Sequence, residues 1–405
     1  MGRNARATRI IGLICLGAML VVSGCAAQGH PIAGEIDVRT LAVGNYPVSR
    51  FHYNQDAQGH GDLLEGMRMS AAVVPTVRID PTLNVGWPVG VHTKDQMDDV
   101  VKVDGMSGVS VPVLQNRGFI VDYASGGADR TLPPSVDPTQ PNLNAVSVVL
   151  LRFDTADDAT LAAQELEAAD FEVALQQNQR LSIDAYPNAL IHWRPGVATV
   201  AVWMARKQFV VRLFVTTLSA DQQELLSLAH KALDAEVPAV DAFQATPTDK
   251  LNTLQVDPGD LLARAVVAQR DPARVPDPSN FAVYNPDELI DASTDKAARQ
   301  QMIDKAGVDE IGIVDTDVIL RTRSTAAGLG LVADLIAYVG NSYSADTSPP
   351  QVPDAKCLHN NGSGDGKAYR CFVPYKRYLA VVNSDTAVDA QQQATAEYAL
   401  LANSM

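Results

Sequence analysis

The sequence predicts an α+β fold of two related modules, each ordered as strand, helix, antiparallel meander and helix, with the helices packed on one face of antiparallel-rich sheets. Three observations support it. β-branched apolar runs alternate with segments of helical periodicity. The same order of segments occurs in both halves of the chain. Matching residues of the two halves keep a nearly constant separation; for example, Leu151-Arg152 and Leu320-Arg321 lie 169 positions apart.

The first module begins with an apolar run at residues 146–153, which reads as a buried strand. Thr155 is placed to cap the helix that follows, and Ser219 to cap the last one, with Gln222 in capping-box position. Between the two helices the pattern predicts a meander with a turn at Arg206-Lys207. We expect the first helix at 156–169, the strands at 189–193, 199–204 and 209–215, and the last helix through 233.

The second module repeats this order, beginning with a strand at 318–321. Ser324 or Thr325 is expected to cap its first helix, and a hairpin turns at Lys376-Arg377. The last helix contains Ala390-Gln391-Gln392-Gln393, which matches Ala220-Asp221-Gln222-Gln223 at an offset of 170. A duplication explains this register, and convergence of two common β-α-β-β-α folds is the alternative.

The modules define the expected domains. Gly61-Asp62-Leu63-Leu64 and Gly259-Asp260-Leu261-Leu262 each open a helical stretch, at an offset of 198, so the first half carries an insertion. Pro238 and Pro247 mark the connection between the halves. The domains are a signal peptide (1–24), a tether (25–44), a first domain (45–237, core 146–235, insertion about 100–143), a linker (238–258) and a second domain (259–405, core 318–402).

The N-terminus has the pattern of an export signal. Arg3, Arg6 and Arg9 precede an apolar run at 10–22 that is too short to span a bilayer permanently. Val22-Ser23-Gly24-Cys25 then resembles the bacterial lipoprotein box. We expect cleavage before Cys25, lipid on its sulfur and attachment to the outer face of a membrane, where two or more acyl chains give stable anchoring. An ordinary secretory peptide with a chance cysteine is the alternative.

The charge balance argues against nucleic acid as a partner. The whole chain has a formal net charge of −15, which becomes −18 once the three arginines of the signal are removed. Such acidity repels nucleic acid and anionic lipid head groups. The predicted membrane attachment therefore depends on the lipid of Cys25.

The four cysteines have separate expected fates. Cys15 leaves with the signal and Cys25 takes the lipid. Cys357 and Cys371 bracket residues 358–366, which are rich in turn formers and read as a loop. An oxidising compartment favours a disulfide between these two, which stabilises by about 3 kcal/mol in the chain-entropy model. Two free thiols or a metal site are the alternatives, although His359 alone is a poor ligand set.

Three segments carry a resemblance to a known family. They are Leu41-Ala42-Val43-Gly44-Asn45-Tyr46-Pro47, Gly61-Asp62-Leu63-Leu64-Glu65-Gly66-Met67-Arg68-Met69 and Val77-Arg78-Ile79-Asp80-Pro81-Thr82-Leu83. In this order behind a lipobox, they resemble an uncharacterised lipoprotein family of mycobacteria and related actinobacteria, known as a domain of unknown function. The resemblance implies a compartment and a lineage, and it supplies no catalytic residue.

No catalytic, cofactor or metal site is predicted. Ser107 and Ser125 do not fit the G-x-S-x-G elbow of hydrolases, and their Gly-rich surroundings read as flexible loop. His192 reads as a packed strand residue. His52 and His60 with Asp62 match no metal spacing.

Two groups of side chains carry oxygen atoms of the kind that binds Ca²⁺. Asp95, Asp98 and Asp99 follow Thr93 and read as first-turn acids of a helix, with Thr93 and Gln96 as a capping box. The second group consists of Asn360, Asn361 and Asp365. Asparagine and aspartate are common in turns, so a turn explains these residues equally well.

The leading functional hypothesis is a non-enzymatic envelope protein that binds a small ligand or a partner protein in a cleft between the modules, since pockets often form at domain interfaces. The alternatives are an envelope hydrolase or transferase with an unrecognised active site, tested through Ser107, Ser125, His192 and His60, and a structural component of the cell wall surface.

Overall fold

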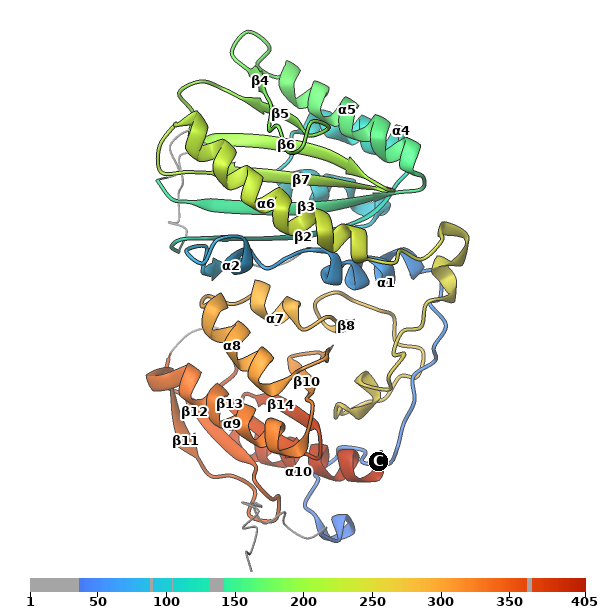
Figure 1. Cartoon of the computed structure of the whole chain (residues 1–405). Coiled ribbons are helices and arrows are strands. Elements are labelled where there is room, and N and C mark those ends of the chain that lie inside the picture. The colour runs from blue at the N-terminus through green and yellow to red at the C-terminus, as the bar shows by residue number, and fades with distance from the viewer. Residues whose placement is uncertain (1–35, 88–89, 104, 132–141, 363–365) are drawn as a thin grey trace, which may run out of the picture. The chain divides into compact units, whose positions relative to one another are not determined.

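Two seven-stranded antiparallel sheets form the framework of the chain (Figure 1). The structure is a computed structural model that describes residues 36–87, 90–103, 105–131, 142–362 and 366–405. Residues Asp37–Met405 form one compact unit. The predicted signal peptide and most of the tether therefore lie outside the described residues. Of the tether, a short 3-10 helix at Val38–Thr40 is described.

The first sheet has the order β1-β2-β3-β7-β6-β5-β4. Its strands are β1 (Val85–Gly86), β2 (Phe119–Ala128), β3 (Ala145–Phe153), β4 (Gln179–Leu181), β5 (Leu190–Trp193), β6 (Thr199–Arg206) and β7 (Phe209–Thr216). The helices of this half are α1 (Gly61–Arg68), the 3-10 helix η2 (Met69–Ala72), α2 (Thr76–Ile79), α3 (Met97–Val103), α4 (Val111–Asn116), α5 (Ala156–Glu172) and α6 (Gln222–Ala242).

The second sheet has the order β8-β9-β10-β14-β13-β12-β11. Its strands are β8 (Phe281–Tyr284), β9 (Glu310–Val314), β10 (Asp317–Arg321), β11 (Tyr343–Asp346), β12 (Lys356–Asn360), β13 (Tyr369–Tyr375) and β14 (Tyr378–Ser384). The helices are α7 (Asp287–Asp291), α8 (Lys296–Ala306), α9 (Thr325–Val339) and α10 (Ala387–Asn403).

The two sheets have the same topology. Each strand of the first sheet has a counterpart at the same place in the second, and a helix follows the third and the seventh strand of each. The pairing registers agree as well, because Val149 lies opposite Arg212 and Val318 lies opposite Val381, each residue 169 positions on. The predicted α+β class with two related modules is confirmed.

The strand pairing also locates the extra residues of the first half. Val121 of β2 lies opposite Arg152, as Glu310 of β9 lies opposite Arg321, so β2 and β9 are counterparts. The expected insertion at about 100–143 thus includes a strand that both modules possess. The clearest extra segment is the connection 129–144 between β2 and β3, where β9 and β10 are joined by a tight turn.

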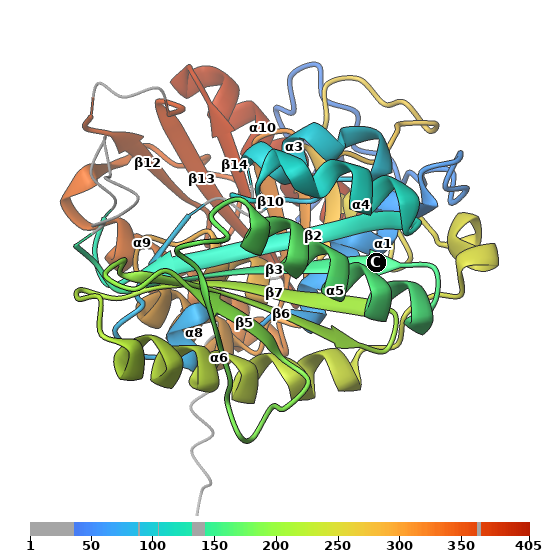
Figure 2. The same cartoon turned by 90° about the horizontal axis from the view of Figure 1, so that it is seen from above.

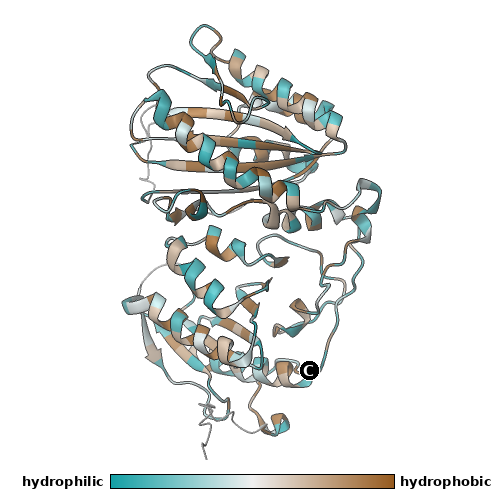
Figure 3. Cartoon of the chain, in the orientation of Figure 1, coloured by the Kyte–Doolittle hydropathy of each residue, from teal (hydrophilic) through white to brown (hydrophobic). Residues whose placement is uncertain are grey.

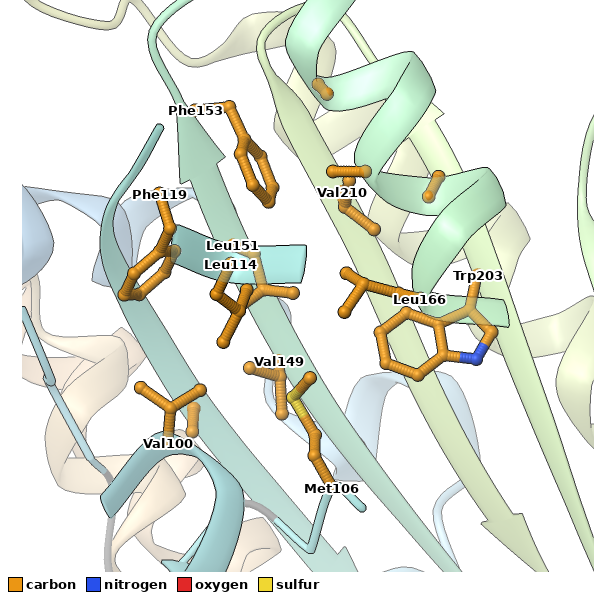
Figure 4. Close-up of a cluster of buried hydrophobic side chains, with 14 residues drawn as sticks. Val100, Met106, Leu114, Phe119, Val149, Leu151, Phe153, Leu166, Trp203 and Val210 are labelled. Atoms are coloured by element: carbon orange, nitrogen blue, oxygen red, sulfur yellow. The ribbon is translucent and has the colours of Figure 1, made fainter. Parts of the chain in front are cut away.

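Helices cover both faces of the first sheet, whereas the sequence predicted helices on one face. Val149 and Leu151 of β3 pack with Leu166 of α5, on the face seen in Figure 4. Arg152, the residue after Leu151, points to the opposite face and pairs with Glu65 of α1. α6 also lies on that second face, next to the segment that follows α1 (Figure 2). In this contact Val74 N, two residues after η2, donates a hydrogen bond to Glu236 of α6.

The burial of the strands explains this double cover. All ten residues of β2 are buried, and seven of the eight in β7. Figure 3 shows hydrophobic residues concentrated along the central strands, whereas α6 alternates between polar and apolar positions. Strands that are apolar on both faces need helices on both faces.

Two predicted helix boundaries are wrong. α6 is capped by Asp221, which accepts hydrogen bonds from Gln223 N and Glu224 N, so Ser219 is outside the helix and instead donates to the Glu224 carboxylate. The helix also continues through Pro238 to Ala242, so the connection between the modules begins later than 238.

The helical stretch expected after Gly259 is also shorter than predicted. Only a 3-10 helix forms, at Leu262–Arg264. The reason is local: the Asp257 carboxylate accepts hydrogen bonds from Leu262 N and Ala263 N, which holds these residues in a tight turn.

Candidate functional site

The two modules meet through the end of β2, with β1, and the segment of α7 and α8. Gly86 N donates to Ser293 O over 2.8 Å, and Lys296 Nζ donates to Gly126 O over 2.9 Å. Glycine is required at residue 86, because a Cβ there would lie 2.0 Å from the Asp291 carbonyl oxygen. This close backbone approach fixes one module against the other.

The segment 124–127 was expected as a flexible loop around a candidate nucleophile, and this prediction is wrong. It belongs to β2, and Ser125 is buried there, with 2 % of its surface exposed. Gly126 and Gly127 read as loop formers in sequence. Here they make room for Trp87 and Lys296 against the strand.

A cleft of about 720 Å³ lies between the modules, next to this contact. The first module contributes α1, η2 and the end of α6, the second contributes β8 and β9, and the connection between them closes a side. Its lining residues are Leu64, Met67, Arg68, Ala71, Ala242, Phe243, Gln244, Thr253, Leu254, Gln255, Val256, Pro258, Val283, Tyr284, Asn285, Asp309 and Glu310.

The wall from the first module presents a guanidinium group. Arg68 ends α1 and donates to the Glu65 carboxylate, to Thr246 Oγ1 over 2.6 Å and to Gln244 O over 3.2 Å. Its guanidinium also lies 5.5 Å from the centre of the Phe243 ring. These contacts hold in place a cation whose side chain is still 41 % exposed.

A buried ion pair contacts Arg68 from the interior of the first module. Arg152 Nη1 lies 2.5 Å from Glu65 Oε1, and neither side chain is more than 1 % exposed. Burial lowers the pKa of Arg152, while the Glu65 carboxylate counteracts part of that shift. Glu65 therefore joins the core arginine to the arginine of the cleft.

The wall from the second module is acidic. Glu310 Oε2 lies 2.8 Å from Arg321 Nη1, and Asp309 pairs with both Arg321 and Arg377. Burial raises the pKa of Glu310, and Arg321 opposes that rise. The lining also includes apolar side chains and amide groups. The cleft therefore suits a molecule with an apolar body and polar groups.

A second polar cluster is sealed inside the contact between the modules. Lys296 and Asp291 form an ion pair with a separation of 3.0 Å and no exposure of either side chain. Burial raises the pKa of Asp291 and lowers that of Lys296, and each group offsets part of the other's shift. Tyr123 donates to Glu288 Oε2 over 2.8 Å beside them, and burial raises the pKa of Glu288 to about 7. These groups hold the modules together and do not line the cleft.

The other candidate nucleophiles and bases lie apart from the cleft. His192 is buried in β5, with Nδ1 3.3 Å from Glu167 Oε1 and Nε2 3.4 Å from Asp170 Oδ2. Ser107 precedes a short 3-10 helix, where its carbonyl accepts from Ser110 N. His60 precedes α1 without a side-chain cap. Within the described ranges, no hydrogen bond joins any of Ser107, Ser125, His60 and His192 to another.

The candidate metal ligands are explained by local contacts. His52 Nδ1 lies 3.0 Å from Asp260 Oδ1, and Asp62 accepts from Leu63 N. Thr93 N donates to Gln96 Oε1, as the predicted capping box requires. Asn360 accepts from Gly362 N, and Asp365 lies outside the described residues. Among the residues that are described, no group of three His, Cys, Asp or Glu side chains is arranged to hold a metal ion.

The predicted disulfide is confirmed, between Cys357 and Cys371. These residues are direct partners on β12 and β13. The loop expected at 358–366 is shorter than predicted, because Leu358, His359 and Asn360 continue β12 and pair with its neighbours.

The lipobox, Val22-Ser23-Gly24-Cys25, lies outside the described residues. In the part of the chain that is described, no helix has both the length and the apolar character needed to cross a membrane.

Sequence reasoning placed a cleft between the modules but identified none of its polar residues. Arg68 lies in the segment 61–69, which carries the family resemblance, and no motif marks it as a binding residue. Tyr284 and Glu310 lie in short strands without a catalytic pattern. The one sequence signal for the cleft was the duplication, because two related modules in one chain were expected to form a cleft where they meet.

Comparisons with known proteins identify a family. Among solved structures, the extracellular domain of PknH from Mycobacterium tuberculosis matches at 14% sequence identity with a TM-score of 0.27, covering 43% of this chain and 95% of that chain. No curated protein matches the chain. Residues 52–256 match the N-terminal model of a domain of unknown function, DUF7373, and residues 261–404 match its C-terminal model. The chain therefore belongs to the DUF7373 family.

Proposed function

We propose that this protein is a lipid-anchored protein of the cell envelope that binds a ligand in the cleft between its two modules. The lipid would be carried by Cys25 after cleavage of the signal, and the protein would face the outside of the membrane. The segments 41–47, 61–69 and 77–83, in this order behind the lipobox, support an origin among lipoproteins of mycobacteria and related actinobacteria.

The cleft is the observation that carries the binding proposal. Its volume of about 720 Å³ falls in the range of sites for small molecules, roughly 300–1,000 Å³. Its walls come from both modules, with Arg68 on one side and Glu310 on the other. A binder needs these features and no nucleophile. We therefore favour binding over catalysis.

The sealed contact between the modules supports the same proposal. Lys296, Asp291 and Glu288 are buried groups whose partners lie on both modules or beside their contact. Such a contact keeps the cleft walls at a fixed separation, and a preformed cleft loses less freedom when a ligand binds.

Native mass spectrometry tests the binding proposal. We expect the full chain, purified from cells that produce it naturally, to carry a bound molecule. Ala71→Trp places a large ring in the cleft from an exposed position of η2 and should remove the bound mass. Ala326→Trp makes the same change at an exposed position of α9 outside the cleft and should keep it. A wild-type protein without any bound mass, or an Ala71→Trp variant that retains it, would contradict the proposal.

Fractionation tests the anchor. We expect the wild-type chain in the membrane fraction and the Cys25→Ser variant outside it, because serine cannot accept the thioether-linked lipid. Cys15→Ser is the matched control, since it changes a cysteine that leaves with the signal. Equal distribution of the two variants would overturn the lipid assignment.

A further inference from the structure

We infer that the ligand of the cleft is a peptide in extended conformation, which pairs with the backbone of Val283 on the edge of β8. This inference rests on the proposed binding function and names the class of molecule that it concerns.

β8 is the last strand of its sheet and has only β9 as a neighbour. Edge strands leave a row of backbone N–H and C=O groups without ladder partners, and extended peptides bind to such rows. Most of this edge is closed by the chain itself. Phe281 exchanges two hydrogen bonds with Asp277, at 2.8 and 3.0 Å, and Asn285 N donates to Ser70 Oγ over 3.4 Å.

The pairing register shows which way the groups of Val283 point. In an antiparallel ladder, both backbone groups of a residue face the same side, and the side alternates along the strand. Asn280 O accepts from Asp315 N, toward β9, whereas Phe281 and Asn285 bond away from β9. Val283 lies midway between the latter two, so its N–H and C=O also face away from β9.

Val283 is the open position on this edge. It is the one residue of β8 that is not buried, and it lines the cleft. Among the described residues, no hydrogen bond is found on the outward side of its N–H or C=O. One residue of a bound peptide can therefore form a pair of hydrogen bonds here, while the closed positions at Phe281 and Asn285 limit the pairing to that residue.

The rest of the lining suits a peptide as well. Gln244, Gln255 and Asn285 supply side-chain amides, which both donate to and accept from peptide groups. Leu64, Met67 and Phe243 supply apolar surface for alternate side chains. A sugar or a lipid would use parts of this lining, but neither has the backbone N–H and C=O pair with which an extended peptide adds to a strand edge.

A library of N-acetylated, C-amidated hexapeptides tests the inference. Affinity selection on the full-length protein, read by mass spectrometry, should retain a subset of peptides that Ala71→Trp does not retain. The tightest of them is then N-methylated at one residue at a time. We expect methylation to abolish binding at the residue that faces Val283 and to leave binding nearly unchanged at its two neighbours, whose N–H groups point away.

Two variants of the strand complete the test. Val283→Pro removes the outward donor at an edge position where proline is tolerated, and it should weaken the peptide about tenfold. Val283→Ala keeps the donor and should bind within about twofold of wild type. If Val283→Pro does not fold, the methylation series on the wild-type protein still decides the matter.

The outcomes separate this inference from the proposed function. If no peptide is retained while native mass spectrometry finds a different molecule in the cleft, the peptide assignment is overturned and the binding function stands. If peptides bind but neither methylation nor Val283→Pro changes the affinity, strand pairing is overturned. If nothing binds in the cleft, both proposals fail.

Discussion

Lys296 donates a hydrogen bond to Asp291 over 3.0 Å at a place where neither side chain is exposed. The same ammonium group donates to the carbonyl of Gly126, on the edge region of the other sheet. A single buried cation thus connects the two modules. Removing it leaves the Asp291 carboxylate buried without its charge partner.

We predict that Lys296→Met lowers the free energy of unfolding by about 3–5 kcal/mol, since breaking one half of a buried ion pair is costly. Urea denaturation followed by circular dichroism measures this. Lys305→Met is the control, because Lys305 pairs with Asp334 at an exposed surface, and exposed pairs contribute about 1 kcal/mol or less. Equal effects of the two substitutions would show that the buried pair does not hold the modules together.

We predict that the protein loses stability as the pH rises from about 4.5 to 7, in part because of Glu288. Burial raises the pKa of this carboxyl from 4.5 to about 7, so the folded state binds more protons than the unfolded state in that window. A shift of this size corresponds to about 3 kcal/mol. Glu288→Gln should flatten the pH profile of unfolding by roughly this amount.

The partner of Glu288 provides a second arm of this experiment. The Tyr123 hydroxyl lowers the pKa of Glu288 by donating to it. Tyr123→Phe should therefore extend the loss of stability to higher pH and reduce stability at neutral pH. A profile of Glu288→Gln that is parallel to the wild-type profile would refute the assignment of the titrating group.

His192 should change the stability of the folded protein over a different pH range. Burial lowers the pKa of His192, but hydrogen bonds to Asp170 and Glu167 outweigh burial and raise it overall above 6.5. The stabilisation by these hydrogen bonds is fully present below the pKa that His192 has in the unfolded chain. It is lost as the pH rises through the pKa that His192 has in the folded protein. We expect His192→Gln to cost about 1 kcal/mol at pH 5.5 and less at pH 9. The titration of His192 by NMR gives the folded pKa directly, and a value below 6.5 would contradict the prediction.

Loss of the disulfide should destabilise the second module. The bond joins directly paired residues of β12 and β13, and a loop of this length stabilises by about 3 kcal/mol. We expect Cys357→Ala with Cys371→Ala to lower the midpoint of thermal unfolding by several degrees. Hydrogen exchange should rise in β11 to β13 before it rises in the first sheet. An unchanged midpoint would show that the strand pairing holds without the bond.

The duplication was predictable because it follows from patterns of neighbouring residues in the sequence. The apolar run at 146–153 and the helix cap at Thr155 are signals of nearby residues, and both elements form where expected. The turns at Lys207 and Lys376 also form at matching places, each with a positive φ. Such features depend on few neighbours in sequence, so the sequence carries them plainly.

The contact between the modules was not predictable in the same way. Gly126 and Gly127 read as loop residues in sequence, because glycine disfavours strands. Their place in β2 is explained by distant neighbours, Trp87 against Gly126 and Thr76 with Lys296 against Gly127. Lys296 itself reads as a solvated helix residue. Its burial depends on Asp291 and on a carbonyl 170 positions away. Polar groups that are satisfied by distant partners leave no local signal.

Hydrogen exchange measured by mass spectrometry tests a shared binding cleft most directly. The full chain is compared with and without the molecule that co-purifies with it, added back at a saturating concentration. We predict slower exchange at residues 64–71, 242–244, 253–258 and 283–285 together, because both modules and their connection line the cleft. Protection confined to one module, or located away from these segments, would contradict a site formed between the two.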